Sequence, residues 1–204
     1  GASGFVGKNL IAKLVEEYSI YGLSRSNKKS TDNLKWIQTD LFSYSCTQKG
    51  LEGTDIAIYL VHSMLPSSRL FQGSFQDTDL LLADNFAKAC KHNGVKQIIY
   101  LGGLVPDSGE SKHLASRREV EDVFNASGVP TTILRAGLIV GSGGSSFEIL
   151  NNMVHNLPGM ILPRWTRRST QAIYIDDLVS VLYQSIKNKS FLGKTINVVN
   201  GERI

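Results

Sequence analysis

Residues 1–7 read Gly1-Ala2-Ser3-Gly4-Phe5-Val6-Gly7, which places three glycines in the spacing G-x-x-G-x-x-G. The apolar periodicity of residues 8–18 predicts an amphipathic helix directly after this loop. Glycines at the start of a helix allow a tight turn, a close approach of the backbone to a phosphate, and close packing on a sheet. The free N–H groups and the positive end of the helix dipole favour an anion at the same place. The loop therefore predicts a nucleotide site formed by Gly1, Ser3, Gly4, Phe5, Val6 and Gly7, with a purely structural turn as the alternative.

Strands and helices alternate along the rest of the chain. The predicted strands are residues 19–24, 36–37, 55–61, 97–101, 131–135 and 195–199, and the predicted helices are 77–93, 112–125, 147–156 and 177–187. Residues 55–61 and 97–101 are nearly continuous apolar runs, which is typical of strands buried on both faces of a parallel sheet. This alternation is typical of βαβ units. The predicted fold class is α/β, a doubly wound parallel sheet with helices on both faces.

The glycine loop also predicts something about the centre of that sheet. A loop of this type normally follows a central strand, and the sequence offers no strand before Gly1. The neighbouring strands would then expose unpaired backbone donors and acceptors. We therefore expect the first strand to be missing from residues 1–204 and the sequence to be incomplete at its start. It is also expected to continue after Ile204.

Composition excludes several classes of protein. The 204 residues are 42% hydrophobic and 20% charged, as in a soluble globular domain, and we expect one domain over 1–204 with a substrate-side insertion at 141–172. No apolar run approaches the ~20 residues of a membrane span, and no secretion signal is evident. Two cysteines make neither a disulfide framework nor a zinc site, so no metal site and a cytoplasmic location are expected. The net charge of +4 is scattered, which argues against nucleic acid and suits a polyanionic cofactor.

The strand after the loop ends in Ser24 and Arg25 rather than in a carboxylate. A dinucleotide site usually places an acidic residue there to bind the adenosine ribose. The guanidinium of Arg25 can instead bind a 2′-phosphate through two parallel hydrogen bonds, helped by Ser24 and Lys28. The sequence therefore favours NADP(H) over NAD(H) as the cofactor. The alternatives are NAD(H) and an ordinary surface arginine.

Together these motifs resemble the short-chain dehydrogenase/reductase superfamily, in its atypical NmrA-like branch of NAD(P)H-binding proteins. The resemblance covers essentially the whole sequence and includes the glycine loop, Asp40-Leu41, the glycine-ended strand 98–103, and the stretches 134–141 and 173–178. Residues 59–64 and 162–165 look like a bacterial subgroup commonly labelled nucleoside-diphosphate-sugar epimerase. The resemblance implies a Rossmann-type domain that binds NAD(P).

The resemblance also implies further binding residues. Asp40 and Leu41 match the position that contacts the adenine. Leu60, Val61, His62 and Ser63 would border the central ribose and the nicotinamide half of the cofactor, with Ser63 also a substrate candidate. At the end of the strand 98–103, Leu101 and Gly102 are cofactor candidates and Gly103 is a substrate candidate. Arg164 and Trp165 are further substrate candidates, with a solvated loop as the alternative.

The predicted catalytic positions depart from the superfamily. Active members carry a Tyr and a Lys four residues apart on the helix after the fifth strand, and a Ser at that strand's end. The matching positions here are His113 and Arg117, and Gly102-Gly103. A spacing of four keeps His113 and Arg117 on one helix face. His113 suits proton transfer near neutral pH, and Arg117 suits a ribose clamp because it stays charged. The alternative is a surface helix that carries no catalytic pair.

A second match to Y-x-x-x-K, from Tyr183 to Lys187, follows Asp176-Asp177 on the last predicted helix and is interpreted as chance. The sequence thus favours an NADP(H)-dependent oxidoreductase that acts on a carbonyl or quinone-like small molecule. A non-catalytic NADP(H)-sensing regulator with a protein partner is the alternative, and the loss of Tyr, Lys and Ser favours it. Nucleotide-sugar epimerisation or dehydration is a third interpretation, which needs a strong base that the sequence does not offer. A homodimer is compatible with each of them.

Overall fold

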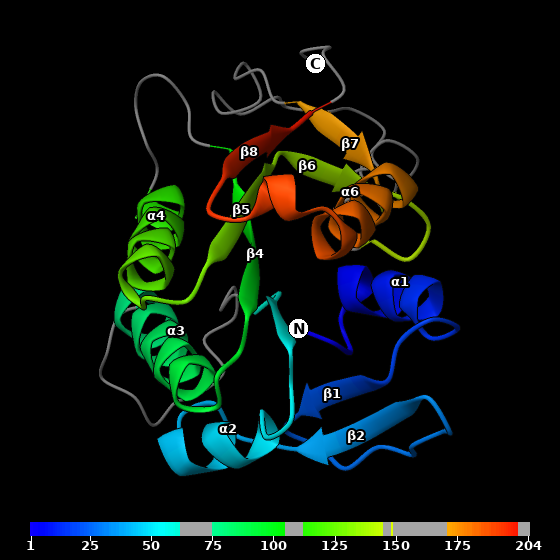
Figure 1. The fold of residues 1–204 in the computed structure, drawn as a ribbon. Helices are drawn as coiled ribbons and strands as arrows, with labels where there is room; N and C mark the ends of the chain where they lie inside the picture. Colours follow the sequence, from blue (N-terminus) through cyan, green and yellow to red (C-terminus); the bar gives the residue numbers. More distant parts are fainter. Residues whose placement is uncertain (62–74, 105–111, 145–147, 149–170, 200–204) are drawn as a thin grey trace, which may run out of the picture.

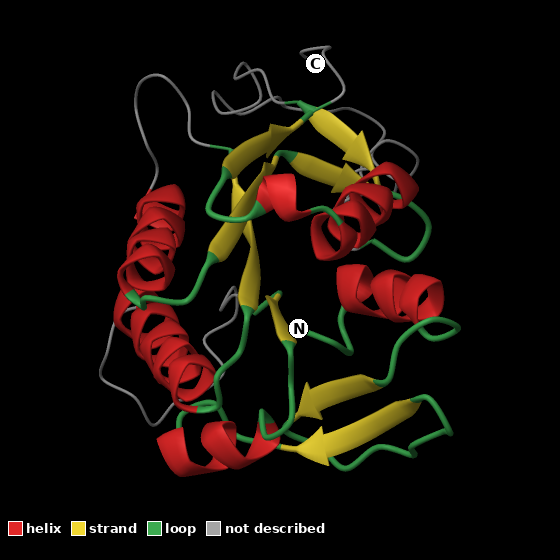
Figure 2. Ribbon diagram, viewed as in Figure 1, coloured by secondary structure: helices red, strands yellow, loops and turns green. Residues whose placement is uncertain are grey.

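The computed structural model describes residues 1–61, 75–104, 112–144, 148 and 171–199. Its strands pair in parallel throughout, as predicted for an α/β fold (Figures 1 and 2). The largest sheet has the order β3-β4-β5-β8, and β1-β2 and β6-β7 form two smaller pairs. The strands are β1 (Ile20–Ser24), β2 (Leu34–Gln38), β3 (Ile56–Tyr59), β4 (Gln97–Gly103), β5 (Thr131–Ala136), β6 (Leu138–Val140), β7 (Ala172–Tyr174) and β8 (Thr195–Val198).

Helices cover both faces of the four-stranded sheet. Figure 1 shows α1 (Phe5–Leu14) and α6 (Ile175–Lys187) on one side, and α3 (Phe75–His92) and α4 (Lys112–Ala126) on the other. The short helix α2 (Tyr44–Gly50) packs on α3, and a 3-10 turn, η2 (Lys189–Phe191), follows α6. None of the described helices is both long and apolar enough to cross a bilayer.

Each layer of helices buries its own apolar core against the sheet. On the α3–α4 side, Tyr59 packs edge-on against Phe86 and Phe124, with ring centroids 4.9 and 5.0 Å away. On the α1–α6 side, Leu10 and Leu14 meet residues of α6 that recur on one helix face: Leu178, Val179 and Leu182. The apolar strands predicted from the sequence therefore lie between two cores, which is why they show no alternation.

The sheet is interrupted between β1 and β3. Among the described strands these two face each other without a ladder, and a cavity lined by Ile20 and Leu23 of β1 and by Ile56 and Ile58 of β3 lies between them.

Several boundaries differ from the prediction. Helix α1 begins at Phe5 rather than at residue 8, because Gly4 takes an extended conformation and its carbonyl accepts the first helical hydrogen bond from Lys8 at 2.9 Å. Helix α2 was not predicted, since its seven residues carry no apolar period. Strands β6 and β7 have three residues each, too few to show a periodicity. The predicted helix 147–156 and most of the predicted insertion 141–172 lie outside the described residues.

Candidate functional site

The glycine loop lies against the carboxyl end of β3. A Cβ atom at Gly1 would collide with the backbone of Leu60, and one at Gly7 would collide with the carbonyl oxygens of Gly1 and Ala2. The N–H of Gly4 donates to the Gly1 carbonyl at 3.0 Å and closes the turn. Helix α1 has no side-chain cap hydrogen bond and no acidic residue in its first turn. The loop is therefore a backbone cradle at a helix start, which fits a phosphate group.

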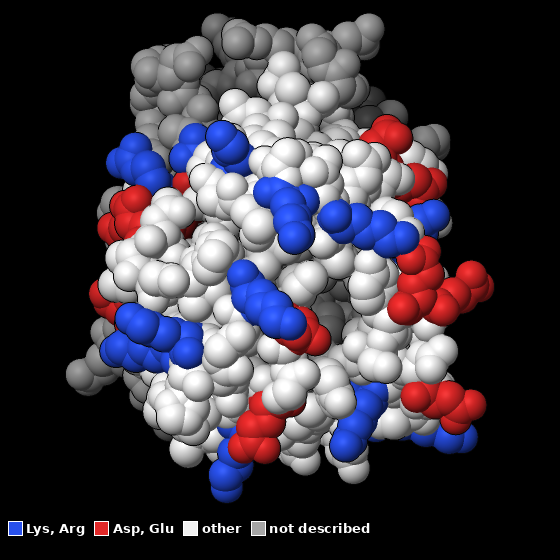
Figure 3. All heavy atoms as spheres, viewed as in Figure 1, with Lys and Arg blue, Asp and Glu red and all other residues white. Residues whose placement is uncertain are grey.

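The cavity that separates β1 from β3, of about 1110 Å³ in all, also reaches this cradle and the carboxyl ends of three strands. The residues on its wall that the sequence predicted as cofactor-binding are Gly1, Ser3, Gly7, Ser24, Arg25, Asp40, Leu41, Leu60 and Val61. They come from the glycine loop and from the carboxyl ends of β1, β2 and β3, the edge at which open α/β sheets bind ligands. Figure 3 shows this face hollowed near its centre, with charges of both signs interspersed around the hollow.

At the tip of β1, hydroxyl groups surround the start of the next loop. The Ser26 backbone N–H donates to the Ser24 hydroxyl at 3.3 Å, and the two hydroxyl oxygens are also 3.3 Å apart. Gln38 of β2 donates its side-chain amide to the Arg25 carbonyl at 3.1 Å, which fixes the backbone there. Arg25 itself is exposed and has no ion pair with a carboxylate in the described part of the chain. The tip thus offers one guanidinium and two hydroxyls.

Lys28 does not join that group. Its ammonium lies 5.5 Å from the centre of the Trp36 ring, in a cation–π contact, and it is absent from the cavity wall. The indole of Trp36 attracts the lysine toward β2, so the help of Lys28 in binding a 2′-phosphate stays a prediction. Ser26, which the sequence did not single out, lines the cavity instead.

The segment after β2 is held by α3. The exposed carboxylate of Asp40 accepts the backbone N–H of Phe42 at 3.0 Å, which makes a local turn. The Asn85 amide of α3 donates to the carbonyls of Leu41 and Phe42 at 2.9 and 3.1 Å. Asp40 and Leu41 are thereby fixed at the cavity edge where the resemblance expects the adenine.

At the end of β4, side chains of helix α4 pack closely over Gly102 and Gly103. A Cβ atom at Gly102 would come within 2.8 Å of the Glu121 Oε1 atom. A Cβ atom at Gly103 would come within 2.9 Å of Leu114 Cδ2 and 3.3 Å of Arg117 Cδ. A side chain at Gly102 would thus displace the buried Glu121 carboxylate, whereas one at Gly103 would displace only the end of the Leu114 side chain. Leu101, Gly102 and Gly103 are not on the cavity wall, and their binding roles stay predictions.

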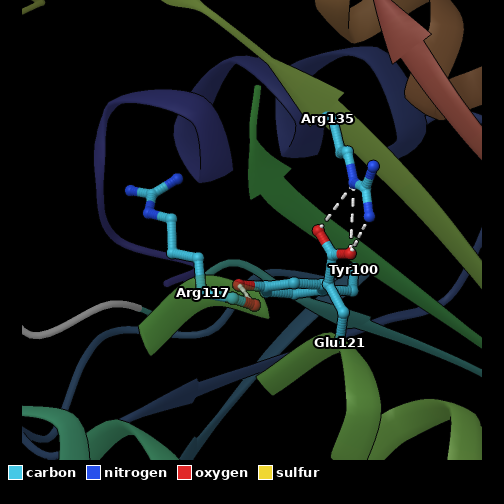
Figure 4. A network of polar contacts seen from close by, with 4 residues as sticks. All are labelled: Tyr100, Arg117, Glu121 and Arg135. Atoms are coloured by element: carbon cyan, nitrogen blue, oxygen red, sulfur yellow. Dashed lines mark hydrogen bonds and ion pairs between the residues drawn. The ribbon is translucent and has the colours of Figure 1, made fainter. Parts of the chain in front are cut away.

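A polar network ties α4 to β4 and β5 (Figure 4). The Arg135 Nε atom donates to both Glu121 oxygens at 3.1 Å, and Nη2 donates to Oε2 at 2.6 Å. The Tyr100 hydroxyl donates to the Arg117 carbonyl at 3.4 Å, and burial raises the pKa of this phenol while the Arg117 charge opposes the rise. The Arg117 side chain points away from the ion pair (Figure 4), and its buried Nε has no hydrogen-bond partner in the described part of the chain.

Sequence reasoning missed the role of Glu121 and Arg135. Arg135 lies in the stretch 134–141 that carried the resemblance, and Glu121 follows Arg117 by one helical turn. Of the catalytic candidates, Arg117 is described fully, whereas His113 is placed only by its backbone in the first turn of α4. His62, Ser63, Arg164 and Trp165 lie outside the described residues.

The second Y-x-x-x-K match is far from the glycine loop along α1. The Tyr183 hydroxyl donates to Glu17 Oε1 at 2.6 Å, and Lys187 pairs with Glu17 Oε2 at 2.7 Å. The ammonium groups of Lys187 and Lys13 also lie over the Tyr183 ring, at 4.7 and 5.5 Å from its centre. Because Glu17 follows the C-terminal end of α1, these residues join α1 to α6 and take no part in the cavity.

Comparison with known proteins agrees with the fold. A family model described as NAD(P)H-binding matches residues 1–156. The auxiliary protein GraX of Staphylococcus aureus is 33% identical over 119 residues, which are 57% of this chain and 39% of GraX, so the match spans well under half of that relative.

Two solved structures illustrate the likeness of fold. A nucleoside-diphosphate-sugar epimerase from Staphylococcus aureus has a TM-score of 0.80 at 17% identity, over 100% of this chain and 70% of its own. The UDP-glucuronic acid 4-epimerase of Bacillus cereus, solved with UDP-glucuronic acid and NAD, has a TM-score of 0.78 at 17% identity, over 100% and 77%. At such identities the likeness concerns the fold alone. With more than half of its residues matched by the family model, the chain belongs to the NAD(P)H-binding family.

Proposed function

We propose that this chain binds NADP(H) along the carboxyl ends of β1, β2 and β3 and acts as an oxidoreductase on a carbonyl or quinone-like small molecule. The observation that carries the choice of NADP(H) is the tip of β1. There Arg25, unpaired with any carboxylate among the described residues, shares the cavity wall with Ser24 and Ser26, whose hydroxyl oxygens are 3.3 Å apart. A guanidinium with hydroxyl neighbours suits a phosphate ester and gives an unesterified ribose little to bind.

We propose places for the other parts of the cofactor from the residues on the cavity wall. The backbone cradle from Gly1 to Gly7 would hold the pyrophosphate, because it lies at the start of α1, whose first turn has no side-chain cap hydrogen bond and no acidic residue. Asp40 and Leu41 would border the adenine, and Leu60 and Val61 would lie toward the nicotinamide half.

The reaction itself would be shared between cofactor and protein. When bound, the nicotinamide supplies or accepts the hydride. The Arg117 guanidinium remains charged at any ordinary pH, so it can hold a ribose hydroxyl or a carbonyl oxygen but cannot relay a proton. His113, one turn earlier on α4, is our candidate for the proton donor.

Substrate-dependent oxidation of NADPH tests this proposal. We expect turnover on at least one member of a panel of aldehydes, ketones and quinones, measured by the loss of reduced-nicotinamide absorbance. His113→Ala should lower kcat by about a hundredfold while NADPH still binds, since a general acid contributes a factor of this order. Exposed His92→Ala is the matched control and should keep full turnover. Turnover that is unchanged in His113→Ala would remove this histidine from the mechanism.

A second candidate is an NADP(H)-binding protein whose output is a contact with a partner protein. Two observations favour it: a side chain at Gly102 would displace the Glu121 carboxylate, and the relative GraX is named an auxiliary protein. Tight NADPH binding without turnover across the panel would support this candidate over the first. The epimerase names of the structural neighbours weigh less, because positions 113 and 117 lack the Tyr and Lys of that chemistry.

A further inference from the structure

We propose that the Glu121–Arg135 ion pair positions Arg117, by seating α4 on β4 so that the Arg117 guanidinium is held toward the nicotinamide half of the cofactor. The inference rests on the proposed function, because it concerns the same cofactor site. It assigns a task to two residues that, like Arg117 itself, are not on the cavity wall. Arg117 is placed near the cofactor edge by its packing over Gly103, at the carboxyl end of β4 and next to β3.

The pair is built to hold a fixed geometry. The Glu121 side chain is 3% exposed and that of Arg135 is 26% exposed, and three hydrogen bonds join them at 2.6 to 3.1 Å. A forked contact of this kind fixes the direction of approach as well as the distance. Loss of one partner would leave a buried charge without compensation, and α4 would have to shift or admit water.

The pair also reaches across β4. Gly102 of β4 is the ladder partner of Arg135 on β5, and the Glu121 carboxylate lies directly over Gly102. Because Gly102 has no side chain, Glu121 of α4 can pass over one strand and bind the next. The ion pair thus determines how close α4 comes to the end of β4.

That distance determines where Arg117 lies. Arg117 is four residues before Glu121, one turn along the same face of α4. Its Cδ atom packs over Gly103, and its carbonyl accepts the Tyr100 hydroxyl at 3.4 Å. Figure 4 shows the two arginines on opposite sides of the glutamate, with Arg117 directed away from the pair. A shift of α4 would therefore move the Arg117 guanidinium away from the proposed nicotinamide half of the cofactor.

The test compares two ligands that differ in whether they reach the nicotinamide half: NADPH and adenosine 2′,5′-bisphosphate. Calorimetric titration of wild type, Glu121→Gln and Arg117→Met should give a Kd for NADPH about tenfold weaker in both variants, the size expected for losing one charged hydrogen bond. The Kd for the bisphosphate, which would bind at the β1 tip, should stay within about twofold. The exposed Glu119→Gln on the same helix is the matched control and should change neither value.

The double variant adds a further check. Glu121→Gln combined with Arg117→Met should bind NADPH no more weakly than Arg117→Met alone, because both changes act through one guanidinium. Arg135→Lys keeps the positive charge but loses the forked hydrogen bonds to Glu121. It should therefore weaken the binding of NADPH and leave that of the bisphosphate unchanged, and it replaces Glu121→Gln in the test if that variant does not fold.

Four other results would overturn the inference, and they differ in what they say about the proposed function. Equal weakening of both ligands by Glu121→Gln would mean that the pair only stabilises the fold. An unchanged NADPH Kd in Glu121→Gln, with a weakened one in Arg117→Met, would refute the positioning role and leave the proposed function intact. An unchanged Kd in Arg117→Met would refute it as well. Wild-type protein that does not bind NADPH would overturn the proposed function and this inference together.

Discussion

The Glu121 carboxylate occupies the space that a side chain at Gly102 would need. A Cβ atom at Gly102 would lie 2.8 Å from Glu121 Oε1 and 3.2 Å from Tyr100 Cε1. The first contact is closer than real side chains tolerate, and both neighbours are buried. Glycine at position 102 is thus required by the Glu121–Arg135 ion pair, because a larger side chain there would displace the Glu121 carboxylate.

Gly102→Ala should therefore destabilise the protein. We expect the free energy of unfolding to fall by about 1–3 kcal/mol, as for other insertions of a methyl group into a packed site. Denaturant unfolding followed by circular dichroism measures it. Glu119→Gln, exposed on α4, should stay within about 0.5 kcal/mol of wild type. A Gly102→Ala variant as stable as wild type would show that α4 can move freely and that the close packing is not required.

The contact between α1 and α6 predicts that the stability of the protein depends on pH in the acid range. The hydrogen bond from Lys187, and then that from Tyr183, lower the pKa of Glu17 below its ordinary value of 4.5. Because the folded-state pKa is the lower one, the stabilising contribution is present above 4.5 and is lost as the pH falls through the folded-state pKa. The melting temperature of wild type should thus approach that of Glu17→Gln as the pH falls.

The effect should be small, since the pair is exposed to solvent. Glu16→Gln, the exposed neighbouring glutamate, controls for the loss of one carboxylate. Melting curves of wild type, Glu17→Gln and Glu16→Gln, recorded from neutral pH down to about pH 3, test this prediction. A constant difference between wild type and Glu17→Gln over this range would contradict the assignment.

The two cysteines should differ sharply in reactivity. Burial raises the pKa of the Cys90 thiol to about 12, whereas Cys46 is exposed. At about pH 8 Cys90 therefore remains a protonated thiol without access to reagent, and thiolate is the reactive form. A thiol reagent should label one cysteine in the native protein and both after denaturation, and Cys46→Ser should abolish native labelling. Labelling of native Cys46→Ser would mean that the α3–α4 core opens readily.

The sequence predicts best what periodicity and glycine spacing encode. The strands β3 and β4 were found because residues 55–61 and 97–101 are nearly continuous apolar runs, as expected for strands buried on both faces, and the cradle was found because its glycines have a fixed spacing. Helix α2 was not predicted, since Tyr44–Gly50 is a polar segment that is helical only through its packing on α3.

Contacts between distant segments could not be predicted in this way. Glu121 and Arg135 are 14 residues apart and meet only because α4 turns one particular face toward β4. Lys28 has the charge to bind a phosphate, yet its ammonium lies over the Trp36 ring of β2 instead. Both outcomes depend on the rotation and approach of whole elements, which a local pattern does not contain.

Titration of the protein with NADPH and NADH, repeated with Arg25→Ala, tests the central claim most directly. The account predicts that wild type binds NADPH more tightly than NADH and that Arg25→Ala weakens NADPH by about tenfold to a hundredfold, the range expected for charged hydrogen bonds, while NADH changes little. Lys29→Ala, an exposed cation in the same loop, should leave both affinities unchanged. Equal affinity for the two cofactors, or equal loss of both in Arg25→Ala, would contradict the account.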